Sequence, residues 1–423
     1  MAFSRALLVR QNFPDRGLKD ISGTVLRELA SAGFASRLAP GARVAIGVGS
    51  RGISNLASIV RAVADYWKAA GMRPFIFPAM GSHGGATAEG QADVLAHYQI
   101  TEATMGCPIV SSLEVVDLGR SPGEGIPTSM DRAAFESDGV VLIGRVKWHT
   151  DFVGALESGL YKMMAIGLGK YAGARRYHVY GHKIGMERVI RSVGRQVLQS
   201  GKILGGLAIL EDAYHHTAQL SAVPVEVMEQ KEEELLALVK SWMGRIPVPE
   251  LDMLVLDEMG KNISGAGMDT KVINRSMYGG YKAWPEGPHI ERVFVRDLSS
   301  LSYGNAVGVG LADVVTDRVL EKIDWAATRV NSITASTPGA IRTPIHYRSD
   351  RECLEAIWQT VGKFDPLEVT ICWIRNTLDL SPLVMSENLL PLIGQNSLLE
   401  VVGEARPLEY DGEGNLVSFF GQA

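Results

Sequence analysis

The feature that most constrains this chain is its alternation of short apolar runs with longer amphipathic stretches. Runs such as Arg43 to Val48 and Gly139 to Gly144 are apolar on both faces, as buried parallel strands are. Strands separated by helices are typical of βαβ units, so the sequence predicts an α/β fold with mostly parallel sheets. Further strands are predicted at 73–78, 203–210, 251–256, 293–298 and 368–373, and helices at 53–70, 86–97, 182–198, 225–243 and 351–361.

The length of the chain and one proline-rich segment predict two domains. A chain of 423 residues is long enough to form two cores. The segment Gly244–Glu250 (GRIPVPE) lies between a charged amphipathic helix and a fresh apolar strand, and its two prolines favour an extended connection. We therefore predict two α/β domains, residues 1–245 and residues 246–423, with the active site in the cleft between them.

Charge, hydropathy and cysteine content exclude several classes of protein. A net charge of −5 and a pI near 6.0 argue against nucleic acid as a partner. A mean hydropathy of +0.07, with no apolar run near the roughly 18–20 residues that a bilayer requires, argues against a membrane. The three distant cysteines imply neither a disulfide framework nor a cysteine zinc site. We expect a cytoplasmic protein without an export signal that acts on a small molecule, and its assembly into a homo-oligomer stays open.

A glycine-rich turn follows the first strong strand. The sequence Gly47-Val48-Gly49-Ser50-Arg51-Gly52 is a GxGxxG that precedes a predicted helix, the context in which backbone amides bind phosphate. A nicotinamide-dinucleotide site would also have an acidic residue at the end of the next strand, which here reads Phe77-Pro78-Ala79-Met80. The alternative is an ordinary tight turn. Arg51 at the start of the helix would suit a bound anion.

A histidine follows the next strand, in the turn Gly81-Ser82-His83-Gly84-Gly85. The carboxyl ends of parallel strands face the ligand crevice, and a histidine between glycines has little chance of packing into a core. His83 is therefore a candidate acid/base group. The alternative is an exposed loop histidine.

The densest cluster of reactive side chains lies between residues 145 and 178. His149 follows the end of the strand Gly139 to Gly144, and Lys162 lies on a short helix. At 100° per residue, Lys162 points away from the core face formed by Leu156, Leu160, Met163 and Met164. A partly desolvated lysine can form covalent bonds to cofactors. The alternative is a solvated helix lysine.

Together these residues resemble the nickel-dependent lactate racemase family. The resemblance covers most of residues 40 to 215 and is looser in the second half, where it rests mainly on residues 257–265. It is carried, in chain order, by Arg51, the turn Gly81-Ser82-His83, the segment His149, Phe152 and Gly154, then Lys162, and finally His178 sixteen residues later.

The resemblance implies a cofactor and a set of roles. Members of the family use a nickel pincer nucleotide derived from a pyridinium mononucleotide. On this pattern Lys162 is its covalent anchor, His178 is a ligand of the nickel, and His83 and His149 are the acid/base pair. The resemblance also implies that Gly49, Ser50 and Arg51 hold the cofactor phosphate or the substrate carboxylate, and we expect Lys261 or Lys271 to contact the substrate from the other domain.

The activity implied by the resemblance is a racemase or epimerase that inverts C2 of a 2-hydroxy acid. The C2–H is too weakly acidic for a histidine to remove as a proton, so a hydride acceptor is required, and one base on each face manages the hydroxyl proton. Two departures suggest a remodelled site: Val48 stands where the family often has an acidic residue, and the interval from His149 to Lys162 is longer than in the lactate enzymes. The alternatives are an NAD(P)-dependent dehydrogenase that uses the turn at 47–52 and a non-catalytic nucleotide- or metal-binding homologue.

Overall fold

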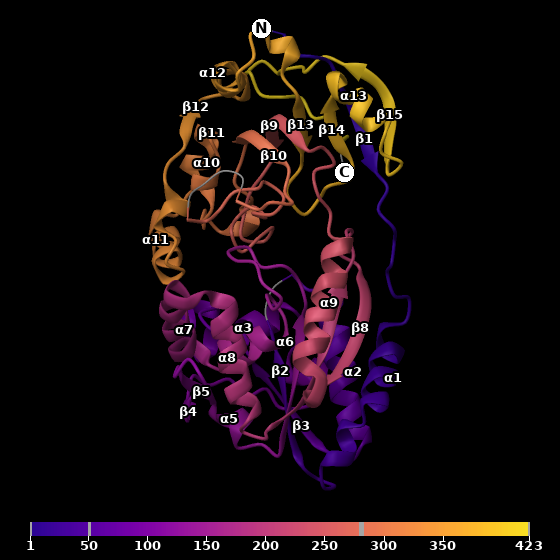
Figure 1. Ribbon diagram of the computed structural model, residues 1–423, viewed down its shortest axis with the longest axis vertical. Coiled ribbons are helices and arrows are strands. Elements are labelled where there is room, and N and C mark those ends of the chain that lie inside the picture. Colours follow the sequence, from indigo (N-terminus) through magenta and orange to yellow (C-terminus); the bar gives the residue numbers. More distant parts are fainter. Residues whose placement is uncertain (1, 50–51, 279–282, 422–423) are drawn as a thin grey trace. The chain divides into compact units, whose positions relative to one another are not determined.

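The computed structural model describes residues 2–49, 52–278 and 283–421. The chain divides into two compact units, one formed by Asp15–Met243 and the other by Met1–Pro14 together with Gly244–Ala423. We name them the five-stranded unit and the eight-stranded unit after their main sheets. Helices and strands alternate along most of the chain (Figure 1), which confirms the predicted α/β class.

The main sheet of the five-stranded unit has the strand order β3-β2-β6-β7-β8. Strands β3, β2, β6 and β7 are parallel neighbours, and β8 folds back antiparallel on β7. Because parallel strands end at the same edge, the carboxyl ends of β2, β3 and β6 meet there. The strands of this unit are β2 (Arg43–Val48), β3 (Arg73–Pro78), β6 (Gly139–Arg145), β7 (Ile203–Glu211) and β8 (Thr217–Pro224), with a separate hairpin of β4 (Val115–Arg120) and β5 (Pro127–Asp131).

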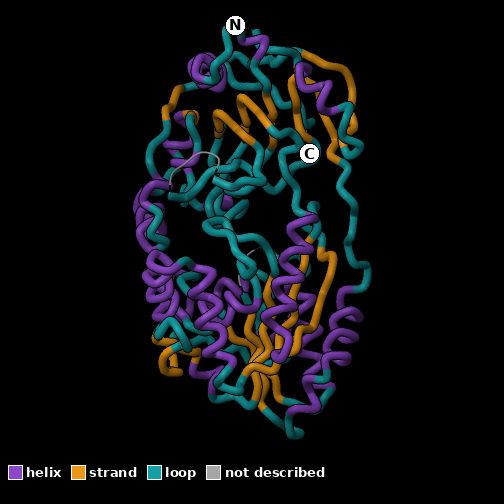
Figure 2. The backbone as a smooth tube through the Cα atoms, in the orientation of Figure 1, coloured by secondary structure: helices purple, strands orange, loops and turns teal. Residues whose placement is uncertain are grey.

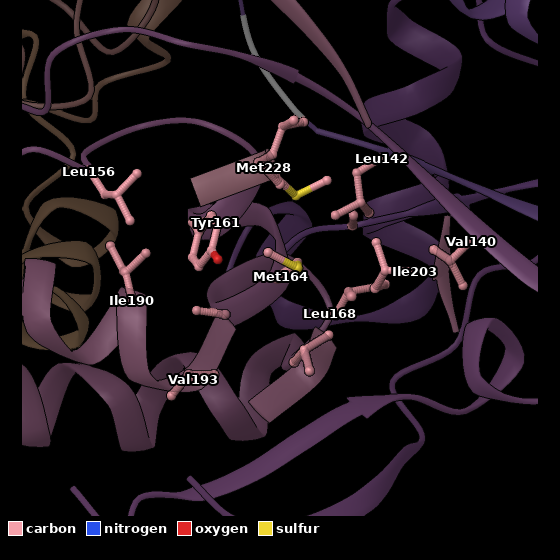
Figure 3. Close-up of a cluster of buried hydrophobic side chains, with 14 of the residues drawn as sticks. Val140, Leu142, Leu156, Tyr161, Met164, Leu168, Ile190, Val193, Ile203 and Met228 are labelled. Carbon is pink, nitrogen blue, oxygen red and sulfur yellow. The ribbon is translucent and has the colours of Figure 1, made fainter. Parts of the chain in front are cut away.

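Helices cover both faces of this sheet, as the colouring by secondary structure in Figure 2 shows. Alternate residues of β2 belong to two different apolar clusters: Val44 and Ile46 pack with α1 and α2, whereas Ala45 packs with α8 and α9. Figure 3 shows part of the second cluster, which includes Tyr161 and Met164. The helices are α1 (Ile21–Ala32), α2 (Leu56–Ala69), α3 (Ala88–His97), α4 (Glu102–Met105), α5 (Arg132–Phe135), α6 (Leu160–Lys162), α7 (Lys170–Ile184), α8 (Met186–Leu198) and α9 (Met228–Trp242).

The sheet of the eight-stranded unit has the order β12-β11-β10-β9-β13-β14-β1-β15. The strands from β12 to β13 in this order are parallel neighbours, and the remaining pairs, β13-β14, β14-β1 and β1-β15, are antiparallel. The strands are β1 (Ala6–Gln11), β9 (Glu250–Leu256), β10 (His289–Val295), β11 (Val314–Thr316), β12 (Ile345–Tyr347), β13 (Ile371–Ile374), β14 (Leu383–Ser386) and β15 (Leu399–Arg406). The helices are α10 (Asp317–Glu321), α11 (Trp325–Thr334), α12 (Asp350–Ile357) and α13 (Leu390–Ile393).

The start of the chain differs from the predicted domain of residues 1–245. Strand β1 pairs with β14 and β15, for example Leu7 with Met385 and Val9 with Val401, so residues 1–14 belong to the eight-stranded unit. Periodicity reports that a segment is a strand but not which distant strand it pairs with. The predicted boundary near residue 245 lies close to the observed division between Met243 and Gly244.

The predicted helix at 182–198 is in fact two helices. Gly185, with a φ of 87°, ends α7 and begins α8. A left-handed backbone of this kind favours glycine and breaks the helical hydrogen-bond series. Among the described residues, no helix combines the length and the apolar character that crossing a bilayer requires.

Candidate functional site

A pocket of about 180 Å³ lies at the carboxyl edge of the five-stranded sheet. Each of the three strand ends expected there contributes to it. Gly49 follows β2, His83 follows β3, and Arg145 and Lys147 mark the end of β6. The segment from Ser158 to Gly167 supplies another wall.

Glycine at the end of β6 allows this wall to approach the sheet. A Cβ added to Gly144 would lie 2.4 Å from the Met163 Sδ, which is far closer than van der Waals contact. Any larger residue at position 144 would displace the Met163 side chain, which itself lines the pocket.

Lys162 lines the pocket together with His83. It is the last residue of α6 and is followed by one turn of π-helix, Met163–Gly167. Its neighbours Leu160, Tyr161 and Met164 are buried in the apolar cluster of Figure 3, while Lys162 is only partly buried. Met163, predicted to face the core, packs against the apolar cluster and also lines the pocket.

His149 lies on a closed loop that joins β6 to α6. The loop is closed at its base by two backbone hydrogen bonds between Lys147 and Ser158, of 3.0 and 3.1 Å. The buried carboxylate of Glu157 accepts the N–H groups of His149 and Gly154. Lys240 forms an ion pair with the same carboxylate. These bonds connect the backbone of the loop to Ser158 and to the Glu157 carboxylate.

The ring of His149 is oriented by its own loop. Its Nδ1 accepts the Asp151 N–H at 3.0 Å, and the ring stacks on Phe152 with 4.3 Å between the centroids. Because a backbone amide can only donate, the neutral ring carries its proton on Nε2. The residues of this loop that line the pocket are those at its base, Lys147 and Ser158.

His178 lies on α7, close enough to Lys162 for the lysine charge to affect its pKa. Burial, together with the positive charges of Lys162 and His182, lowers the pKa of His178 to about 4. The imidazole is therefore neutral at neutral pH. Neutral imidazole is the form that binds a metal ion.

The other predicted binding residues fall in three places. Gly49 lines the pocket. Ser50 and Arg51 lie outside the described residues. Lys261 and Lys271 belong to the eight-stranded unit, where the ammonium of Lys261 bonds to the Gly265 carbonyl and that of Lys271 lies 2.8 Å from the centroid of the Trp284 ring. Their contact with substrate stays a prediction.

Two backbone amides at and just after the end of the glycine-rich turn donate to protein groups. The Gly52 N–H donates to the Tyr98 hydroxyl at 3.1 Å, and the Ser54 N–H donates to the Glu211 carboxylate at 2.7 Å. Glu211 also forms an ion pair of 2.6 Å with Arg145. A dinucleotide-binding turn offers such amides to a pyrophosphate, so this arrangement disfavours the dehydrogenase alternative.

Sequence reasoning missed several residues of the site. Arg145 and Lys147 line the pocket although no role was assigned to them, and Glu157 and Glu211 hold its loops. Arg145, Lys147 and Glu211 lie at the ends of β6 and β7, which is a usable signal because polar residues at strand carboxyl ends are often functional. Lys170, which is fully buried behind the pocket, gave no such signal.

The fold is shared with at least one solved structure. No protein-family model matches the chain, and no curated protein matches it by sequence. The crystal structure of a structural genomics target from Thermotoga maritima matches with a TM-score of 0.53 at 12% identity, over 86% of this chain and 98% of that one. The lactate racemase apoprotein of Thermoanaerobacterium thermosaccharolyticum gives a TM-score of 0.45 at 13% identity, over 86% and 99% of the two chains. The first of these likenesses shows a common fold and does not extend to the chemistry of the pocket.

Proposed function

We propose that this chain is a racemase or epimerase that inverts C2 of a 2-hydroxy acid, with a nickel pincer nucleotide held covalently by Lys162. The observation that carries the proposal is the shared pocket of Lys162 and His83 at the carboxyl ends of parallel strands. Three cysteines that are buried and unpaired are in keeping with a reducing, cytoplasmic setting.

The residues around the pocket fit the proposed cofactor. Lys162 supplies an amine inside the pocket, and His178 supplies a neutral imidazole within its electrostatic reach. Glycines at 49, 81, 144, 159 and 167 line the pocket, so no side chain from these positions fills it. When bound, the cofactor would supply an electrophilic carbon that accepts a hydride from the substrate.

His83 has the chemistry needed for the hydroxyl proton of the substrate. As the C2 hydrogen leaves with its electron pair, the hydroxyl must lose a proton, which a neutral imidazole accepts and later returns. His149 differs in the hydrogen bond that its ring already makes. Its Nδ1 already accepts the Asp151 N–H, so its Nε2–H is set to donate a hydrogen bond. To take a proton at Nε2, the ring must first exchange its proton to Nδ1 and release the amide.

Positive charge in the pocket suits an acidic substrate. Lys147 and Arg145 both line it, and Arg145 also forms an ion pair with Glu211. We assign Lys147 to the substrate carboxylate because it lines the same pocket as Lys162, alongside Arg51, Lys261 and Lys271, which the sequence predicts for this task.

The experiment is chiral chromatography of a panel of 2-hydroxy acids after incubation with protein made in a host that synthesises the cofactor. We expect at least one acid to be inverted by the wild type and none by Lys162→Met. Lys183→Met, on an exposed face of α7, is the matched control and should retain activity. If no acid is inverted although nickel is bound, a non-catalytic metal-binding protein becomes the better description.

A further inference from the structure

Lys170, at the start of α7, is a lysine with no exposed surface. Its ammonium lies 2.8 Å from the Pro78 carbonyl, 2.7 Å from the Gln91 Oε1 and 3.7 Å from the Asp131 Oδ2. An ammonium has three N–H donors, and three acceptors surround this one. Lys170 thus joins the end of β3 to α3 and β5.

Gln91 continues the contact toward His83. Its side chain is also fully buried, and its amide donates to the carbonyls of Met80 and Gly81, at 3.2 and 3.0 Å. Together, Lys170 and Gln91 bind three carbonyls in the stretch that ends two residues before His83. The turn that carries His83 is therefore attached to the helix that follows the Lys162 segment.

The turn and the Lys162 segment also touch directly. A Cβ on Gly81 would lie 2.9 Å from the Ile166 Cγ2, and one on Gly167 would lie 2.8 Å from the Ala79 carbonyl oxygen. Both glycines line the pocket. A small displacement of the turn would consequently change the distance between His83 and Lys162.

Lys170 lowers the stability of the fold at this position in two ways. Its φ of 53° lies in the left-handed region, where a residue with a Cβ is strained. Burial of an ammonium also costs more than burial of an apolar side chain of the same size. Strain and buried charge at a single residue behind a pocket are typical of functional sites.

We propose that Lys170 and Gln91 are positioning residues that fix the His83 turn relative to the Lys162 segment. The catalytic meaning of this inference rests on the proposed function. The claim that Lys170 and Gln91 fix the His83 turn does not depend on the cofactor, and it is also tested in the cofactor-free protein.

Gln91→Glu is the most selective test. The substitution keeps an acceptor for Lys170 but replaces the two N–H donors to Met80 and Gly81 with an oxygen that repels their carbonyls. We expect kcat to fall about 10- to 100-fold, the order of loss that a small misplacement of a catalytic group causes, with KM changed less than about threefold. In the cofactor-free protein, the His83 ring resonances, assigned by comparison with His83→Gln, should shift.

Two further variants complete the test. Gln91→Met removes the same donors without adding a charge and should move the His83 resonances and kcat in the same direction. Gln196→Glu is the matched control, because Gln196 donates one bond to the Leu118 carbonyl on a partly buried surface of the same unit; it should change neither.

The proposal is overturned if Gln91→Glu and Gln91→Met leave both kcat and the His83 resonances at wild-type values. If the wild type inverts no hydroxy acid, the proposed function fails, and the resonances of the cofactor-free protein still decide the positioning role. Resonances that move as much in Gln196→Glu as in the Gln91 variants would also overturn it.

Discussion

The carboxyl edges of the two sheets are built in opposite ways. In the five-stranded unit, the edge is lined by glycines and holds a pocket with Lys162 and His83. In the eight-stranded unit, Asp257 follows β9 and Arg296 follows β10, and the two form an ion pair across neighbouring strand ends. Asp350, from α12, joins this cluster through Arg296 at 2.7 Å.

This difference shows that strand topology locates a candidate site but does not make one. Both edges satisfy the rule that ligands bind at the carboxyl ends of parallel strands. At the second edge the cluster is extended by Arg318, which lies 2.7 Å from Asp350, and by the Trp373 indole, which donates to Asp257. Side chains of opposite charge satisfy one another there, whereas small residues leave space at the first edge.

The largest effect is expected at the open edge. His83→Gln keeps a polar side chain of similar reach but removes the imidazole that can accept and return a proton, so kcat should fall about 10²- to 10⁴-fold. The rate of inversion, measured by chiral chromatography, checks this. In His97→Gln, on an exposed position of α3, kcat should stay within about twofold of the wild type. Equal losses of kcat in both variants would contradict a specific role of His83 in the reaction.

At the edge of the eight-stranded sheet, the expected effect is on stability. Arg296→Met leaves Asp350 and Asp257 with one partner fewer in a largely buried cluster, and removing one partner of a buried pair costs about 3–5 kcal/mol. Denaturant unfolding, followed by tryptophan fluorescence, measures the loss.

An exposed ion pair of the same unit provides the matched control. Lys322→Met breaks the pair with Asp297 at the surface, which should cost at most about 1 kcal/mol. Comparable losses for Arg296→Met and Lys322→Met would contradict the view that the buried cluster stabilises this edge.

A buried carboxyl group has different partners in the two units, and this difference predicts a smaller effect of pH on stability. Asp350 contacts two arginines, whereas Glu232, on α9, accepts the Tyr161 N–H through Oε2, and its Oε1 has no hydrogen-bond partner among the described residues. Burial raises the pKa of Glu232 from its usual 4.5 to about 8. The folded protein therefore keeps a proton here that the unfolded chain releases.

Because the unfolded chain binds fewer protons between these two pKa values, stability should fall as the pH rises from 4.5 to about 8. The slope from this residue is at most about 1.4 kcal/mol per pH unit. Glu232→Gln should remove this part of the slope, as measured by urea unfolding at several pH values. Glu234→Gln, on an exposed position of the same helix, should retain it; a slope unchanged in Glu232→Gln would refute the assignment.

The sequence predicted the framework of the open edge well, because that framework is local. Strands β2 and β3 have the bounds that their apolar runs predict, since both faces of each are buried. Helix α7 was not predicted, because its central residues, such as Arg175, Arg176 and His178, are polar and give little helical apolar period.

Non-local contacts account for what the sequence did not predict. Lys170 was unremarkable as a lysine, and only the fold brings Pro78, Gln91 and Asp131 around its ammonium. Gly47 suggested a phosphate-binding turn, but a Cβ there would lie 2.7 Å from the Leu142 Cδ2, so the glycine is required by packing within the unit. The same residue type in the same motif thus serves a different physical purpose.

The central claim is that Lys162 holds the cofactor, and peptide mass spectrometry tests it most directly. Protein from a host that makes the nickel pincer nucleotide would be digested and the modified peptide sequenced, with nickel measured in parallel. We predict one adduct, on Lys162, with about one nickel per chain. An adduct on any other lysine, or an unmodified Lys162 in protein that binds nickel, would contradict the account.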